Sequence, residues 1–130
     1  MSTKRILLVD DEAGLLQAMK IRLAVWGYDV ITASSGKEAI NIAKKNKDFF
    51  DAIILDIMMP GIDGLETLNR IRRFDKEVPV LILTAYPSGE KIKEAESLGI
   101  SGFIPKGAQF EDASRIIRVA LRLKKSGEEE

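Results

Sequence analysis

The chain has 130 residues, 45% of them apolar and 31% charged, and its 20 basic and 20 acidic side chains cancel to a formal net charge of zero. This length and composition predict a single globular domain and exclude a disordered chain. Without a basic excess, neither nucleic acid nor a membrane surface is an expected direct partner.

Two residue types are missing from the sequence, cysteine and histidine. A chain without cysteine is compatible with the reducing cytoplasm, where we expect this protein to act. The absence of histidine removes the commonest general base and metal ligand, so site chemistry must come from carboxylate, lysine and hydroxyl groups. The longest apolar runs have the length of strands, and we expect neither a signal peptide nor a spanning helix.

Short apolar segments alternate with longer amphipathic segments along the chain. Residues 6–9, 30–33, 52–55, 80–83 and 102–104 are the predicted strands. The first, third and fourth of them are continuously apolar, which is typical of parallel strands covered on both faces.

The segments between the predicted strands have helical spacing. Gly27 ends the first helix, and capping-box patterns open the second and third, at Ser35 to Glu38 and at Asp63 to Glu66. The fourth follows Pro87 and Ser88 and ends at Gly99. The apolar positions that define the first, second and fifth helices are Leu15, Leu16, Met19, Leu23 and Trp26; Ala39, Ile40 and Ala43; and Ile116, Ile117, Ala120 and Leu121.

Five strand–helix units with short connections predict an α/β fold of the doubly wound (βα)5 type, with helices on both faces of a five-stranded parallel sheet. We expect the domain to span residues 4–124. Residues 125–130 are expected to form a flexible charged tail or the start of a linker.

Polar side chains follow four of the five predicted strands. Asp10 and Asp11 follow the first, Asp56 the third and Thr84 the fourth, and Lys106 comes shortly after the fifth. Because ligands of open parallel sheets bind outside the carboxyl ends of the strands, we expect these side chains to converge on one edge.

Each of these residues also has an ordinary structural interpretation. Acids after a strand often begin a helix, as Asp10-Asp11-Glu12 would, and Asp56 is a typical turn residue. Thr84 would then be a strand end and Lys106 a solvated surface residue. For each residue taken singly, the structural interpretation is favoured, whereas polar residues at four strand ends on the same edge of one sheet favour a shared site.

The residue types of this shared site point to a defined chemistry. Clustered carboxylates repel one another unless a cation lies among them, and all-oxygen ligands suit Mg²⁺. A carboxylate beside Mg²⁺ can attack a phosphoryl group and form an aspartyl phosphate. The metal, an ammonium and a hydroxyl group would then hold the phosphoryl oxygens.

The segments RILLVDDE, ILDIMMPGIDG, LILTAY and GFIPKG, in this order and spacing, resemble the receiver domain of the bacterial response-regulator family. The resemblance covers nearly the whole chain and implies a flavodoxin-like sheet of strand order 2-1-3-4-5. It also implies a phosphorylation-controlled switch of a two-component phosphorelay, rather than an enzyme that turns over.

The resemblance assigns a role to each acid of the predicted site. Asp56 would be the phosphoacceptor and also a Mg²⁺ ligand. Asp11 would bind Mg²⁺ directly, Asp10 mainly through water, and the backbone carbonyl of Met58 would be a further ligand.

The resemblance also implies how the site communicates with the surface. Thr84 would hydrogen-bond the phosphoryl group, and Lys106 would pair with it. Phe103 matches the switch aromatic, which turns inward as Thr84 moves and so couples the site to the surface of the fourth helix, fifth strand and fifth helix. Without the resemblance, Phe103 is better explained as a core residue.

Two further positions would set the lifetime of the phosphorylated state. In this family the residues two after the aspartate and two after the threonine orient or block the hydrolytic water, and here they are Met58 and Tyr86. Met58 has no group that could position water, and Tyr86 is bulky. We therefore expect slow self-dephosphorylation.

One position departs from the family pattern. The lysine is usually followed by a proline joined through a cis bond, whereas Gly107 follows Lys106 here. Because a cis bond before a residue other than proline costs about 2.5–4 kcal/mol, we expect either a trans bond with a shifted loop or a strained cis bond.

A chain without histidine cannot be its own phosphohistidine donor, so a separate histidine kinase or histidine phosphotransfer protein is the expected partner. The output is expected to be a homodimer or a downstream effector bound through the fourth helix, fifth strand and fifth helix. The domain would either stand alone or belong to a longer chain.

Three rival interpretations remain at this point. An aspartyl phosphatase of the haloacid-dehalogenase type needs a second acid two residues after its nucleophile, where Met58 stands. A flavin binder of flavodoxin type would meet repulsion between Asp10-Asp11 and the cofactor phosphate, and topology alone carries no function. A receiver used only for docking is kept open by Gly107.

Overall fold

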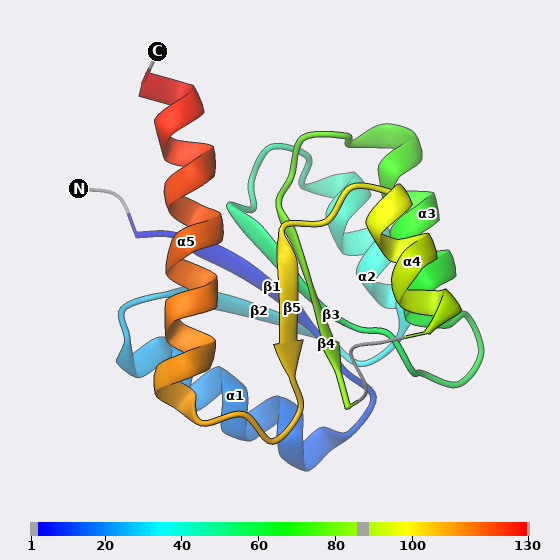
Figure 1. Ribbon diagram of the computed structural model, residues 1–130, viewed down its shortest axis with the longest axis horizontal. Helices are drawn as coiled ribbons and strands as arrows, with labels where there is room; N and C mark the ends of the chain where they lie inside the picture. The colour runs from blue at the N-terminus through cyan, green and yellow to red at the C-terminus, as the bar shows by residue number, and fades with distance from the viewer. Residues whose placement is uncertain (1–2, 86–88, 130) are drawn as a thin grey trace.

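Five parallel strands form the centre of the molecule (Figure 1). The computed structural model describes the backbone of residues 3–85 and 89–129 and the side chains of residues 3–85, 89–109 and 111–122. The strands are β1 (Arg5–Val9), β2 (Asp29–Ala33), β3 (Ala52–Asp56), β4 (Val80–Thr84) and β5 (Gly102–Pro105). Their order in the sheet is β2-β1-β3-β4-β5, which confirms the predicted fold class.

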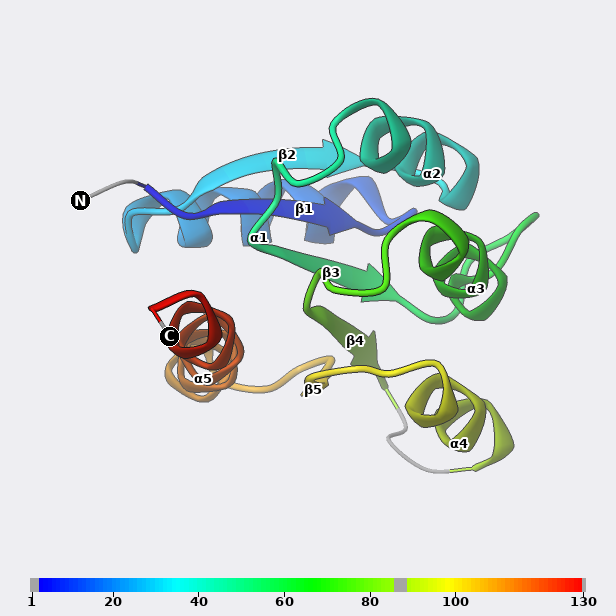
Figure 2. The same ribbon diagram turned by 90° about the horizontal axis from the view of Figure 1, so that it is seen from above.

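The helices lie on both faces of the sheet, with α2, α3 and α4 on one face and α1 and α5 on the other (Figure 2). Right-handed crossovers between parallel strands produce this two-layered cover. The helices are α1 (Ala13–Val25), α2 (Gly36–Lys45), α3 (Gly64–Phe74), α4 (Glu90–Ser97) and α5 (Phe110–Glu129).

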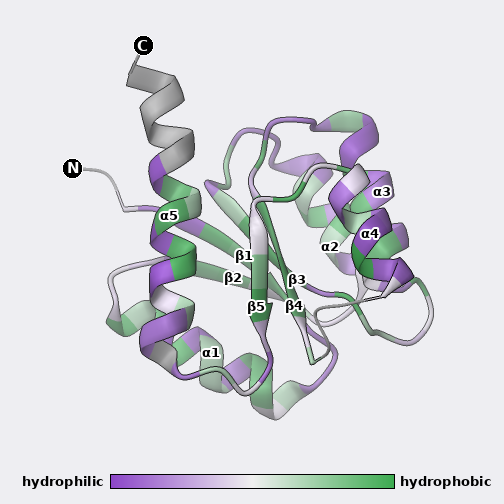
Figure 3. Ribbon diagram, in the orientation of Figure 1, coloured by the Kyte–Doolittle hydropathy of each residue, from purple (hydrophilic) through white to green (hydrophobic). Residues whose placement is uncertain are grey.

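The central strands are coloured as hydrophobic in Figure 3, and alternate residues of each strand enter opposite cores. On β1, Leu7 and Val9 pack in the core beneath α2, α3 and α4, whereas Ile6 and Leu8 pack in the core beneath α1 and α5. All four side chains are completely buried. The continuous apolar runs of the central strands are therefore the consequence of burial on both faces.

The predicted helix starts at Ser35 and Asp63 are confirmed by side-chain caps. The Ser35 hydroxyl accepts a hydrogen bond from the backbone N–H of Glu38 at 3.1 Å, and Asp63 Oδ1 accepts one from Glu66 at 2.9 Å. Each cap satisfies an N–H group that has no partner inside its helix. Pro87 and Ser88, expected before the fourth helix, lie outside the described residues.

The last helix, α5, has 20 residues and is longer than α1 to α4. α5 continues to Glu129 and projects beyond the sheet (Figure 1). The sequence after Leu123 contains lysine and glutamate, which have high helix propensity, and no proline; Gly127, which disfavours a helix, lies within α5. Within the described part of the chain, no helix is both long and apolar enough to cross a bilayer.

The register of the sheet brings the ends of β1 and β3 together. Val9 lies opposite Leu55 of β3 and Ala33 of β2. The next residues along the two central strands, Asp10 and Asp56, therefore emerge side by side at the carboxyl edge of the sheet.

The backbone of Asp56 is also packed against the start of α3. The Gly64 N–H donates to the Ile57 carbonyl at 3.0 Å. A Cβ atom at Gly64 would overlap the backbone carbonyl oxygen of Asp56 and would lie 2.5 Å from the Cα of Ile57. Only glycine allows α3 to approach the end of β3 this closely.

We predict that Gly64→Ala lowers the free energy of unfolding by about 1–3 kcal/mol, because the added methyl group forces α3 and the end of β3 apart. Gly14 is the matched control, since a Cβ atom there meets nothing within 4 Å. Gly14→Ala should raise the free energy of unfolding by about 0.5 kcal/mol. Urea unfolding measures both changes, and equal effects of the two substitutions would contradict the close approach.

Candidate functional site

Three carboxylates gather at the carboxyl edge of the sheet. Asp10, Asp11 and Asp56 each place a carboxylate oxygen within 4.8 Å of the others. Asp10 and Asp56 are completely buried, whereas Asp11 is exposed. The structure therefore brings together the three acids that the sequence placed at two different strand ends.

Backbone N–H groups hold one oxygen of each buried acid. Asp10 Oδ1 accepts from the Glu12 N–H at 2.9 Å, and Asp56 Oδ1 accepts from the Met58 N–H at 3.0 Å. The other oxygen of Asp10, Oδ2, is buried and has no hydrogen-bond partner among the described residues. An unpaired buried carboxylate oxygen is costly, so this oxygen is available to a ligand.

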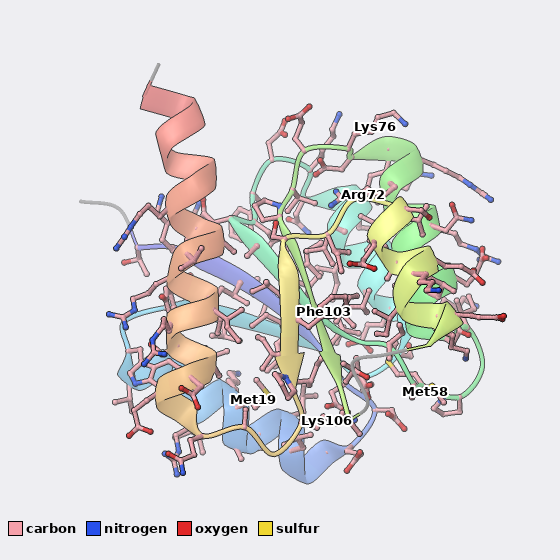
Figure 4. The ribbon with its side chains drawn as sticks, viewed as in Figure 1. Met19, Met58, Arg72, Lys76, Phe103 and Lys106 are labelled. Carbon is pink, nitrogen blue, oxygen red and sulfur yellow. The ribbon has the colours of Figure 1, made fainter. Side chains whose placement is uncertain are left out.

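Lys106 supplies the positive charge nearest to the acids. Its Nζ lies 3.0 Å from Asp56 Oδ2, 3.3 Å from Glu12 Oε1 and 4.0 Å from Asp10 Oδ2. Its backbone N–H donates to the Thr84 carbonyl at 2.7 Å, which joins the ends of β4 and β5. Lys106 and Met58 both lie at the carboxyl end of the sheet, and Arg72 and Lys76 at the opposite end (Figure 4).

The electrostatics of the cluster change two pKa values. Burial raises the pKa of Asp10 to about 6; the Glu12 N–H and Lys106 oppose this rise, and the charge of Asp56 adds to it. Burial alone would lower the pKa of Lys106, but the hydrogen bond and charge of Asp56, together with Asp10 and Glu12, raise it. The site therefore holds an excess of negative charge that one ammonium does not neutralise.

This donor set fits Mg²⁺. The ion prefers oxygen ligands and binds through one or two carboxylates while it keeps several waters. Asp10, Asp11 and Asp56 offer such oxygens, and the unpaired Oδ2 of Asp10 is a buried acceptor without a donor. A divalent cation bound among these acids would reduce the repulsion between their charges and would give Oδ2 of Asp10 a partner.

The remaining candidates occupy different positions. Thr84 ends β4 and is buried at the same edge of the sheet. Phe103 is half-buried on β5, against the core that contains Ile92 and Ala95 of α4 (Figure 4). The side chain of Met58 is 61% exposed. Tyr86 lies outside the described residues.

The bond between Lys106 and Gly107 is trans, since no cis bond occurs in the described part of the chain. Gly107 has φ of +87°, which favours glycine. Of the two alternatives expected for this bond, the trans form is the one found. The ammonium of Lys106 still reaches Asp56.

Glu12 is the contact that the sequence analysis missed. It was grouped with Asp10 and Asp11 as the start of a helix, and it received no role at the site. Its carboxylate nevertheless contacts the same ammonium as Asp56. The only signal for this contact in the sequence is its place beside two site acids.

The fold and the acidic edge together define a doubly wound α/β domain with a cation site at the ends of its central strands. The family model of the response regulator receiver domain matches residues 6–118. The chain therefore belongs to the response regulator receiver domain family.

Curated relatives are similar in sequence to this chain over most of its length. A probable transcriptional regulator, ycf27, of Guillardia theta is 38% identical over 120 residues, which cover 92% of this chain and 46% of that protein. The response regulator MprA of Mycobacterium leprae (strain TN) is 34% identical over 118 residues, 91% of this chain and 51% of that protein. The chain thus spans about half the length of these relatives.

Solved structures agree with the fold. The chemotaxis protein CheY4 of Vibrio cholerae is 32% identical, with a TM-score of 0.85 over 92% of this chain and 99% of that chain. A chain in the CheX–CheY–BeF3–Mg²⁺ complex of Borrelia burgdorferi is 28% identical, with a TM-score of 0.82 over 88% of this chain and 86% of that chain.

We predict that Asp10→Asn stabilises the metal-free protein at neutral pH. The raised pKa of Asp10 means that the native wild type loses stability as the pH rises from about 4 through about 6, because a charge must then be held beside Asp56. The neutral amide avoids this loss, on the order of 1–3 kcal/mol at pH 7.5.

Urea unfolding in a chelator at pH 7.5 and at pH 4 measures the effect of Asp10→Asn. The gain should be present at pH 7.5 and small at pH 4, where Asp10 of the wild type is already protonated. Asp48→Asn is the control, since Asp48 is exposed at the opposite edge with φ of +68°, which asparagine tolerates. A variant Asp10→Asn less stable than the wild type at pH 7.5 would contradict the prediction.

Proposed function

We propose that Asp56 accepts a phosphoryl group and that the domain is a switch controlled by this modification. The observation that carries the proposal is the position of Asp56, buried at the end of the central strand β3. Its carboxylate lies 3.0 Å from the Lys106 ammonium and beside two further carboxylates. A nucleophile held between a cation-binding cluster and an ammonium is arranged for phosphoryl transfer.

In the transfer step the phosphoryl group moves intact from the nitrogen of the donor to an oxygen of Asp56. An oxygen of Asp56 attacks the phosphorus of a phosphohistidine, the new O–P bond forms and the P–N bond breaks. The nitrogen keeps the electron pair of that bond and takes a proton from solvent. Lys106 donates a hydrogen bond to a phosphoryl oxygen, and the Thr84 hydroxyl binds a second one.

Asp10, Asp11, Asp56 and the Met58 carbonyl are the residues that would hold Mg²⁺. When bound, the ion neutralises charge on the acids and on the phosphoryl oxygens. Mg²⁺ is named as a component of the Borrelia burgdorferi complex that shares this fold, which supports the same ion here.

The phosphoryl donor must be another molecule, because the chain contains no histidine. A histidine kinase or a histidine phosphotransfer protein is the partner that this chemistry requires, and the cytoplasm is the compartment in which we place the exchange. Small acyl phosphates carry the same reactive group and should also react at Asp56.

The output surface of the proposed switch is α4, β5 and α5. Thr84 and Phe103 lie on neighbouring strands, where Ile82 pairs with Phe103 and Thr84 pairs with Pro105. A displacement of Thr84 toward the phosphoryl group would therefore change the positions of Phe103 and α4. We propose that this surface binds a second copy of the chain or an effector. The transcriptional regulators among the relatives are about twice as long, so in them a further segment accompanies the matched part.

We predict that incubation with acetyl phosphate and Mg²⁺ adds one phosphoryl group to the wild-type protein, as measured by intact mass. Asp56→Asn should show no adduct, because the amide is not a nucleophile toward phosphorus. A chelator should also abolish the adduct in the wild type. Asp48→Asn makes the same chemical change at an exposed site at the opposite edge and should react like the wild type.

An adduct that survives in Asp56→Asn would contradict the assignment of the phosphoacceptor. The absence of an adduct from the wild type with acetyl phosphate and also with a purified phosphohistidine donor would contradict phosphoryl acceptance. In that case the docking interpretation would be preferred.

We predict that Met58→Asn accelerates loss of the phosphoryl group. The Met58 side chain is exposed beside Asp56 and has no group that can orient an attacking water, whereas asparagine has two donors and an acceptor. The decay of the intact-mass adduct after removal of the donor measures the rate, and a gain of about tenfold is expected. Met58→Leu is the matched control with no polar group, and an unchanged or slower decay in Met58→Asn would contradict the prediction.

A further inference from the structure

The Lys106 ammonium contacts one acid in the interior of the site and one at its rim. These acids are Asp56, whose side chain is 1% exposed, and Glu12, whose side chain is 62% exposed. Lys106 itself is 19% exposed at its side chain. The ammonium is therefore held between one acid that belongs to the reaction and one that stands outside it.

The Lys106 side chain is mostly buried, and its ammonium is held by these acids. Its backbone is held by the hydrogen bond to Thr84, and a turn follows in which the Ala108 N–H donates to the Pro105 carbonyl at 3.1 Å. Gly107 is in the left-handed region, and a Cβ atom there would meet nothing within 4 Å. A four-carbon stem has many rotamers, so its position depends on what the ammonium binds.

The interior partners of Lys106 are the acids that would also bind a divalent cation. Asp10 and Asp56 belong to the oxygen cluster, and an ion held there competes with the ammonium for the same oxygens. Glu12 lies outside that cluster of three and keeps its carboxylate for Lys106. Of the three acid partners of Lys106 among the described residues, Glu12 is the one outside the cluster, so an ion bound there would leave its carboxylate to Lys106.

We propose that Glu12 is a positioning residue, which holds the Lys106 ammonium at the rim of the site, where the incoming phosphoryl oxygens arrive. The inference rests on the proposed phosphoryl transfer to Asp56. Glu12 acts on the reaction only through Lys106 and does not contact the reacting atoms. The α1 N-terminus that carries Glu12 thereby contributes to the placement of a residue 94 positions later in the chain.

The first experiment tests whether Glu12 and Lys106 are in contact in the protein without metal and without a phosphoryl donor. A carbodiimide joins a carboxylate directly to an amine that lies in contact with it, and exposed carboxylates are the ones it reaches. We expect a Glu12–Lys106 cross-link in the metal-free protein, identified by peptide fragmentation. The exposed pair of Asp63 and Lys91, with 3.4 Å between its charged atoms, is an internal reference of similar separation.

The second arm measures the rate of adduct formation with acetyl phosphate at saturating Mg²⁺, established separately for each variant. Glu12→Gln should lower the rate constant by about three- to fivefold, the size expected when an exposed ion pair that orients a reactive group is lost. In the background of Lys106→Met the same substitution should change nothing. Glu77→Gln, which neutralises an exposed acid before β4 at the opposite edge of the sheet, should react like the wild type.

Each outcome decides the inference. A strong Asp63–Lys91 cross-link without a Glu12–Lys106 cross-link, or Lys106 linked to Asp11 instead, would overturn the pairing. A cross-linked pair with an unchanged rate in Glu12→Gln would leave a structural contact and overturn the positioning role. A faster rate in both backgrounds would show that Glu12 only repels the donor. A wild type that forms no adduct with any donor would overturn the proposed function, and the positioning role with it, whatever the cross-link shows.

Discussion

Two buried carboxylates side by side are the constraint on which the rest of this structure depends. Asp10 and Asp56 are both completely buried, and they adjoin because Val9 of β1 pairs with Leu55 of β3. Burial raises the pKa of Asp10, and the like charge of Asp56 in this region of low dielectric adds to the rise. Apolar residues at these two positions would remove the repulsion and, with it, two of the three carboxylates that can offer oxygens to a cation.

The surrounding elements partly offset the unfavourable burial and repulsion of Asp10 and Asp56. Backbone N–H groups at the turns after β1 and β3 each bind one carboxylate oxygen, and Lys106 approaches from the end of β5. One oxygen of Asp10 has no hydrogen bond in the described part of the chain, and its ion-pair partner Lys106 lies 4.0 Å away. The protein therefore stores at this edge an unfavourable interaction that a ligand can relieve, as is typical of functional sites.

The same edge connects the site to the surface. The ends of β4 and β5 are joined by the hydrogen bond from Lys106 to the Thr84 carbonyl, and Phe103 lies two residues before the end of β5, against the core under α4. A ligand that displaces Lys106 or Thr84 acts on both strands at once. The close approach of Gly64 to Asp56 places the start of α3 against the same edge, so under the proposed function a change at the acid would act on two helices of one face.

The sequence alone determined the elements, the two-sided burial of the central strands, the caps at Ser35 and Asp63, and the strand ends at which polar side chains gather. These features follow from local periodicity and from hydrogen bonds between residues a few positions apart. Only the tertiary structure decided that Asp10 and Asp56 place carboxylate oxygens within 4.8 Å of each other, that Lys106 reaches them through a trans bond before Gly107, and that Glu12 shares its ammonium. Those contacts join residues up to 94 positions apart. They depend on strand register and side-chain rotamers, which only the packing of the whole sheet fixes.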